Sequence, residues 1–155
     1  MKSSISESSH NQNHSNSYAN NGIDEALIER VVRLFYITVR ADTLLGPIFS
    51  ARIPDWEPHL QRMFAFWSSV TLSSGRYHGH PMQKHAALPI DARHFDQWLA
   101  LFITTVREVC PPVAADQFIA RAKLIASSLE MGRAAANGEL LQKGQRFIDS
   151  SLVMN

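Results

Sequence analysis

Hydrophobic side chains recur at the spacing of a single helix face in the segments 23–40, 56–73, 92–109 and 113–132. Asp24, Asp55 and Asp91 precede the first three segments and are suited to cap helix N-termini. Pro111-Pro112 ends the third helix, and the fourth is expected to end near Gly132. Since no stretch alternates between apolar and polar residues with the period of a strand, the pattern predicts an all-α fold.

The polar and glycine-broken segments divide the chain into parts. Residues 1–22, rich in Ser and Asn, are expected to form a disordered tail, and residues 23–133 one domain. Residues 134–155 carry a weaker helical pattern broken by Gly138 and Gly144, which indicates a flexible or loosely docked C-terminal extension. The connection around residues 42–55 turns at Gly46-Pro47, yet it is too apolar for a solvated loop. We therefore expect it to lie over the core or over something bound there.

Composition narrows the classes of function. The 155 residues are 45% hydrophobic, and 15 basic against 14 acidic residues leave a net charge of +1, so no nucleic-acid partner is expected. The single cysteine excludes a disulfide framework and a multi-thiolate metal site. The N-terminus lacks the apolar core of a secretory signal, and no run reaches the roughly 18 apolar residues of a membrane span. We expect no membrane partner and a cytoplasmic location.

Histidines in an apolar context supply the candidate chemistry. His59 begins a helix face that continues with Met63, Phe66, Trp67 and Val70. A neutral imidazole in such a face needs a hydrogen-bond partner or a ligand. His85 follows a glycine-broken segment and precedes a Leu-Pro stop.

Three kinds of site are compatible with these residues. A non-haem metal site would use His78, His80, His85 and His94, but no carboxylate is placed to orient them. A haem site would use one axial histidine, an apolar slot with His59 and Met63 opposite, and nearby cations. The third possibility is an interaction module without a cofactor, although such a core has little use for histidines gathered among apolar faces.

The order and spacing of short motifs add a family resemblance. Between about Ile23 and Gly132 the sequence resembles the truncated haemoglobins, specifically their third group. The motifs are Phe35-Tyr36, Leu45-Gly46-Pro47-Ile48-Phe49, Trp56-x-x-His59, Phe66-Trp67, Tyr77-x-Gly-x-Pro81, Lys84-His85, Leu88-Pro89, Phe95-x-x-Trp98 and Arg121-Ala122.

The resemblance implies a two-over-two helical sandwich, a shortened globin whose irregular segment before His85 delivers one short turn to the iron of haem b. It implies His85 as the proximal iron ligand, with Tyr36 and Trp98 as distal hydrogen-bond donors and His59 as a distal gate or weaker contact. His94 is the rival proximal ligand, but it lies four residues before Trp98 and so shares its side. The remaining haem contacts expected from the resemblance are Phe49, Met63, Phe66, Arg62, Tyr77 and Lys84, with Arg76 as a substitute for the propionates.

The function implied is binding of O2, NO or another diatomic ligand, with redox chemistry on that ligand: nitric oxide oxidation or peroxidase-like turnover. Distal donors slow O2 release, which argues against simple oxygen delivery. A catalytic cycle would need an unidentified reductase, because the chain has no flavin-binding fingerprint. The alternative is a non-enzymatic binding protein or haem-based sensor.

Overall fold

The computed structural model describes residues 21–152, and all regular secondary structure between them is helical. The predicted tail 1–22 lies almost wholly outside this range. No helix within the described range is both long and apolar enough to cross a bilayer. The elements are α2 (Glu25–Ala41), α3 (Gly46–Arg52), α4 (Trp56–Leu72), α5 (Pro81–Ala86), α6 (Ala92–Val109), α7 (Pro112–Ala136) and the short 3-10 helix η1 (Ser150–Leu152).

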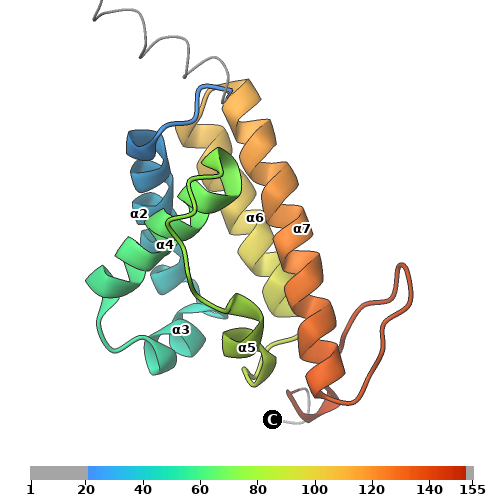
Figure 1. The fold of residues 1–155 in the computed structure, drawn as a ribbon. Coiled ribbons are helices and arrows are strands. Elements are labelled where there is room, and N and C mark those ends of the chain that lie inside the picture. Colours follow the sequence, from blue (N-terminus) through green and yellow to red (C-terminus); the bar gives the residue numbers. More distant parts are fainter. Residues whose placement is uncertain (1–20, 153–155) are drawn as a thin grey trace, which may run out of the picture.

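The four long helices form two packed layers (Figure 1). Helices α2 and α4 make one layer and α6 and α7 the other, with α2 against α6 and α4 against α7 between the layers. The short helices α3 and α5 lie at the same end of the molecule and pack on α2 and α7, respectively. This arrangement confirms the predicted two-over-two sandwich.

A stack of aromatic rings joins the layers. The Phe102 side chain is fully buried and lies between Trp67 and Trp98, with ring centroids 4.8 and 5.5 Å away and nearly parallel planes. Phe35 and Phe118 meet the Phe102 ring edge-on. Burying an aromatic side chain contributes about 1.5–3 kcal/mol, so this stack is a main source of the stability that holds α4 and α6 in register.

Local signals place the helix starts as predicted. The Asp24 carboxylate accepts a hydrogen bond from the Leu27 N–H at 2.8 Å, and the Asp91 carboxylate accepts one from the Arg93 N–H at 3.1 Å. Asp55 is at the N-cap position of α4, although its side chain makes no capping hydrogen bond. Helix α4 ends at Leu72, and its C-cap residue Ser73 adopts a left-handed conformation with φ of 55°.

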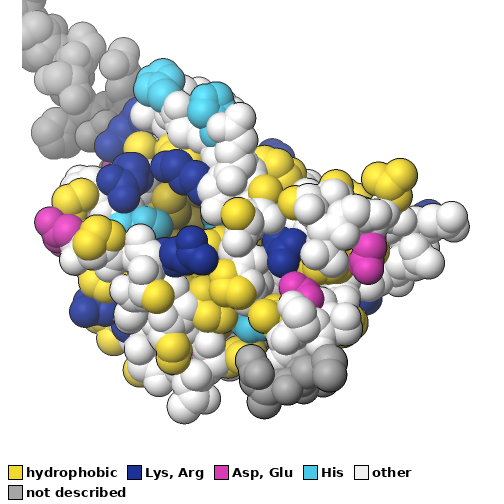
Figure 2. Space-filling model, turned by 90° about the horizontal axis from the view of Figure 1, so that it is seen from below, with side chains coloured by type: hydrophobic (Ala, Val, Ile, Leu, Met, Phe, Trp, Pro, Cys, Tyr) yellow, Lys and Arg dark blue, Asp and Glu magenta, His cyan; other side chains and the backbone are white. Residues whose placement is uncertain are grey.

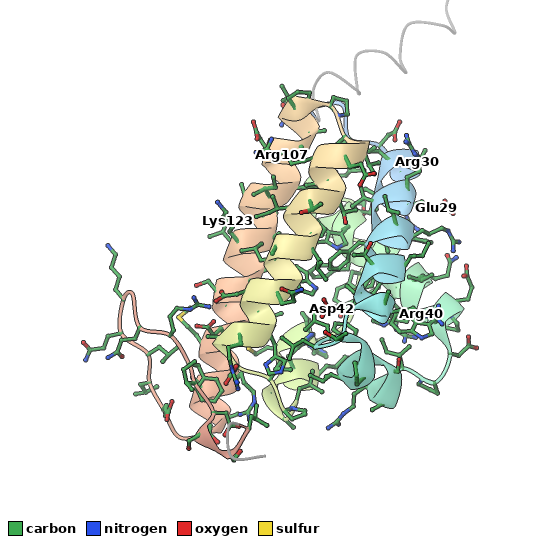
Figure 3. The ribbon with its side chains drawn as sticks, turned by 180° about the vertical axis from the view of Figure 1, so that it is seen from behind. Glu29, Arg30, Arg40, Asp42, Arg107 and Lys123 are labelled. Carbon is green, nitrogen blue, oxygen red and sulfur yellow. The ribbon has the colours of Figure 1, made fainter. Side chains whose placement is uncertain are left out.

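The connection after α2 contains a helix where the sequence indicated only a turn. The Asp42 side chain, labelled in Figure 3, accepts hydrogen bonds from the N–H groups of Leu44 and Leu45 and from the Gln97 amide. Helix α3 then begins at Gly46, where a Cβ atom would lie 2.7 Å from the Arg40 carbonyl oxygen. This close approach requires glycine and turns α3 back over the core, as the apolar character of the segment predicted.

The end of the chain departs from expectation. Helix α7 continues past Gly132 to Ala136, and the segment after it returns to the molecule. Phe147 is 0% exposed, and the Arg146 guanidinium bonds to Glu130 on α7 and Asp96 on α6. Residues 137–146 are irregular and mostly exposed, whereas the chain is docked firmly at Phe147 and Asp149. The partners of this segment lie on helices far away in sequence, so its own weak periodicity carried no sign of them.

Candidate functional site

A cavity of about 470 Å³ opens between the layers at the end where α3 and α5 lie. Its walls come from α2 to α7 and are mostly apolar. The structure brings together at this cavity every residue singled out for the site from the sequence: Tyr36, Phe49, His59, Arg62, Met63, Phe66, Tyr77, Lys84, His85 and Trp98.

His85 reaches the cavity from the six-residue helix α5. Its Nδ1 atom lies 2.6 Å from the Pro81 carbonyl oxygen. Because a carbonyl only accepts hydrogen bonds, Nδ1 carries the proton and Nε2 keeps its lone pair. Burial lowers the pKa of His85, which favours this neutral form. The ring is thus prepared to bind a metal ion through Nε2.

His59 reaches the cavity from α4 and is left unsatisfied. Its Nε2 atom is buried and has no hydrogen-bond partner among the described residues. Burial, together with the positive charges of Arg62 and Lys84, lowers the pKa of His59 to about 4, so the ring is neutral near pH 7. A buried polar atom without a partner costs about 1–3 kcal/mol, which is offset when a ligand in the cavity bonds to it.

Tyr36 stands at the centre of an aromatic group beside His59. Its side chain, from α2, is only 6% exposed and lies edge-on to the His59 ring at 5.1 Å and to the Phe49 ring at 6.0 Å. Burial raises the pKa of Tyr36, so the phenol keeps its proton and is a hydrogen-bond donor. Trp98, from α6, lies edge-on to Phe35 at 5.5 Å and brings a second donor group, its indole N–H, to the residues of the cavity wall.

His94 also lines the cavity but has a structural partner. Its Nδ1 atom accepts a hydrogen bond from the Asp91 N–H at 3.0 Å in a capping box at the start of α6. The His94 Nδ1 atom is also 3.3 Å from Asp91 Oδ1, an acceptor. The contact with the Asp91 N–H is shorter, and a backbone N–H can only donate, so we assign Nδ1 as the acceptor. With Nδ1 as acceptor, the proton of neutral His94 is on Nε2, which has no lone pair for a metal. This argument supports His85 over His94.

The two remaining histidines within residues 21–152 do not line the cavity. His78 and His80 are exposed and are absent from the cavity wall. Within the described residues, no group of three or more His, Cys, Asp or Glu side chains is arranged to hold a metal ion. A metal at this cavity would therefore be carried by a larger cofactor rather than held by protein ligands alone.

Basic side chains border the cavity. Arg52, Arg62 and Lys84 line it, and none of the described lining residues is acidic. Figure 2 shows Lys and Arg side chains gathered beside hydrophobic side chains and histidine on this face of the molecule. Arg76, the expected substitute, instead pairs with Glu25 at 2.6 Å and is not part of the wall. The rim suits the anionic groups of a cofactor whose body is apolar.

Sequence reasoning missed several wall residues. Arg52 was not identified, because nothing in the sequence showed that the segment around it forms a short helix over the cavity. Ile125 and Leu129 lie on the apolar stripe of α7, which was assigned to the core as a whole. The missed residues are Leu45, Ile48, Arg52, Ile53, Pro54, Pro81, Leu88, Ile90, Phe95, Ile125, Ala126 and Leu129.

These features together fit an iron porphyrin. The wall is apolar, the His85 Nε2 lone pair is available, the His59 Nε2 atom lacks a partner, and the rim is basic. An iron porphyrin needs an axial donor, an apolar slot and cations near its two carboxylates. The residues present meet each requirement.

Acid is expected to weaken the fold partly through His59. Between about pH 6.5, where an unperturbed imidazole titrates, and the folded-state pKa of about 4, the unfolded chain binds a proton that the folded chain does not. The free energy of unfolding should therefore fall as the pH falls through this range. In urea unfolding at a series of pH values, His59→Phe should show a shallower decline than the wild type. An unchanged decline would mean that His59 does not titrate in this way.

The comparisons with known proteins agree with this site. A model of the bacterial-like globin family matches residues 16–129. The chain is 33% identical over 113 residues to the group 3 truncated hemoglobin ctb of Campylobacter jejuni subsp. jejuni. The matched region covers 70% of this chain and 89% of that protein. The crystal structure of the group III truncated hemoglobin from Campylobacter jejuni matches with a TM-score of 0.67 at 33% identity, over 70% of this chain and 89% of the other. The chain therefore belongs to the bacterial-like globins, as a group III truncated haemoglobin that binds haem and, through it, diatomic ligands such as O2.

Proposed function

We propose that the cavity holds haem b through His85, and that the protein carries out redox chemistry on a diatomic ligand, with nitric oxide oxidation to nitrate as the leading reaction. The observation that carries the proposal is the hydrogen bond from His85 Nδ1 to the Pro81 carbonyl, because it leaves the Nε2 lone pair for iron. The bound haem would supply an iron centre that binds O2 or NO and exchanges single electrons.

The residues on the cavity wall then have distinct tasks. Tyr36 and Trp98 donate hydrogen bonds to a ligand that gains negative charge, each contributing roughly 1–2 kcal/mol. His59 is neutral and unpartnered, so it either donates to or accepts from the same ligand. Phe49, Met63 and Phe66 exclude water and keep the local dielectric low, which strengthens these bonds.

The rim residues hold the cofactor in one orientation. Arg62, Lys84 and Tyr77 line the cavity; Arg62 and Lys84 would pair with the propionates, and Tyr77 would donate a hydrogen bond to one of them. Burial raises the pKa of Tyr77 while the Arg62 charge opposes the shift, so its hydroxyl stays protonated near pH 7. Arg52, on the same rim, is a further candidate.

Oxidation of NO by O2 to nitrate consumes one electron for each nitrate formed. A bound haem would supply this electron, so continued turnover would need an external reductase, for which the basic rim would offer an approach. Hydrogen bonds from Tyr36, Trp98 and His59 would slow the release of O2, which favours this function over oxygen delivery, since delivery needs rapid release.

Rapid mixing of the oxygenated protein with NO tests the proposed reaction. The expected result is fast conversion to the ferric absorbance spectrum, with one nitrate formed for each haem oxidised. Tyr36→Phe should lower the yield of nitrate per haem, because weaker O2 retention allows NO to replace it. Slow conversion without nitrate would refute the redox proposal and leave only reversible ligand binding.

A further inference from the structure

The C-terminal segment docks beside the element that carries His85. After α7 it returns to the junction of α5 and α6 (Figures 1 and 3). The Ala92 N–H donates to the Phe147 carbonyl at 2.8 Å, and the Asp149 N–H donates to the Asp91 carboxylate at 3.1 Å. Phe147 and Asp149 are both buried. These residues lie beyond the part of the chain that the globin family model matches, residues 16–129.

Arg133 connects this segment to the end of α5. It lies in the last turn of α7 and is only 8% exposed. Its Nε–H donates to the Leu88 carbonyl at 2.5 Å, and its Nη2 atom donates to the Asp149 carboxylate at 3.0 Å. The guanidinium also lies over the Phe147 ring at 5.2 Å. The rigid fork of arginine donates to the two acceptors from two separate nitrogens, whereas an ammonium group has all three of its donors on one nitrogen.

Leu88 carries the connection back to His85. The Leu88 N–H donates to the His85 carbonyl at 3.1 Å, while the Leu88 carbonyl accepts from Arg133. One backbone residue therefore separates the Arg133 guanidinium from the backbone of His85. Through Pro81, the same short helix also sets the orientation of the His85 ring.

Helix α5 needs support from outside. It has six residues, and a helix of that length is not stable on its own. Its main contact is with α7, where the Met82 sulfur lies against Gly132, at a place where a Cβ atom would have no room. The Gly132 contact and the Arg133 bond are adjacent on α7: the first packs on Met82 at the start of α5, and the second holds Leu88, two residues beyond its end.

We propose that Arg133, held by Asp149 and Phe147, is a positioning residue for His85, so that the docked C-terminal segment sets how the imidazole meets the iron. The inference rests on the proposed ligation of haem iron by His85. It assigns the last part of the chain a role in haem reactivity. A change that loosens the segment would free the Leu88 carbonyl from Arg133, and the end of α5 would then hold His85 less firmly against the iron.

Resonance Raman spectra of the ferrous, ligand-free, full-length protein test the proposal through the iron–histidine stretching band. Arg133→Met removes both hydrogen bonds but keeps an apolar side chain of similar length. We expect its band to shift and broaden, and haem loss to become several-fold faster. Asp149→Asn and Arg133→Lys, which each weaken rather than remove the connection, should give smaller shifts in the same direction.

Arg146→Met is the matched control. Arg146 attaches the same segment to Glu130, Asp96 and the Ala92 carbonyl, and none of these acceptors lies in α5. Both methionine variants should lower the Tm, but only Arg133→Met should move the band. Equal bands in Arg133→Met, Asp149→Asn and the wild type would overturn the inference while leaving haem binding intact. If Arg133→Met does not retain haem, the iron–histidine bands of Asp149→Asn and Arg133→Lys decide whether the inference holds. A wild-type protein without an iron–histidine band would instead refute the ligation by His85 and, with it, this inference.

Discussion

Replacing His85 by glycine is expected to abolish stable haem retention. The His85 ring is the one whose Nε2 lone pair is freed by the hydrogen bond to Pro81, so its removal deletes the proposed axial ligand. We expect the purified variant to transfer its haem to a haem-free globin acceptor far faster than the wild type does. The Soret absorbance reports this transfer. Added imidazole should enter the vacated space and restore the spectrum, because it supplies the same donor atom without the chain connection.

His94→Ala is the matched control, because it removes a second histidine from the same cavity. This variant should retain haem with an unchanged iron–histidine band. It should lose about 1 kcal/mol of stability, since the Asp91 N–H loses its acceptor at the start of α6. If His94→Ala lost haem while His85→Gly kept it, the assignment of the proximal ligand would be reversed.

Tyr36→Phe is expected to speed O2 dissociation by about tenfold. The substitution removes one hydroxyl from a buried ring and leaves the edge contacts with Phe49 and His59 in place. The lost bond to a partly negative ligand is worth roughly 1–2 kcal/mol, and about 1.4 kcal/mol corresponds to a factor of ten. Displacement of O2 by excess CO in a stopped-flow instrument measures this rate directly.

CO itself provides the control for Tyr36→Phe. Bound CO carries little negative charge, so its dissociation rate should change much less than that of O2. Trp98→Phe and the double variant complete a cycle that separates the two donors, although loss of the Trp98 stack on Phe102 also costs packing energy. An unchanged O2 rate in Tyr36→Phe would mean that Trp98 dominates, and the proposed role of Tyr36 would be wrong.

The long helices could be predicted because their signals are local. The spacing of Val31, Phe35 and Val39 already defines the buried face of α2, and Asp24 and Asp91 cap helices through bonds to residues two or three positions away. Periodicity and capping depend on a few neighbouring residues, so they can be recognised without knowledge of the fold. The family resemblance supplied the two-over-two arrangement and the candidate residues around the cavity.

The short helix α3 and the end of α7 were not predictable in the same way. Helix α3 is held by Asp42 and by the close approach of Gly46 to Arg40, and α7 passes through Gly132, against which Met82 packs. Glycine usually weakens a helix, but packing against another element outweighs that preference by providing contacts that only the folded chain contains. Neither effect is visible in a window of sequence.

By itself, the sequence determined the four long helices, their order and, with the family resemblance, most of the histidines and aromatic residues that line the cavity. The sequence also favoured His85 over His94, and the tertiary structure added an independent distinction through the opposite roles of Nδ1 in the bonds to the Pro81 carbonyl and the Asp91 N–H. It also decided that the C-terminal segment is docked through Arg133 rather than loose. In both cases the physical reason is that a hydrogen bond depends on the distance and direction between its donor and its acceptor. For Arg133, these groups meet only after the chain has folded.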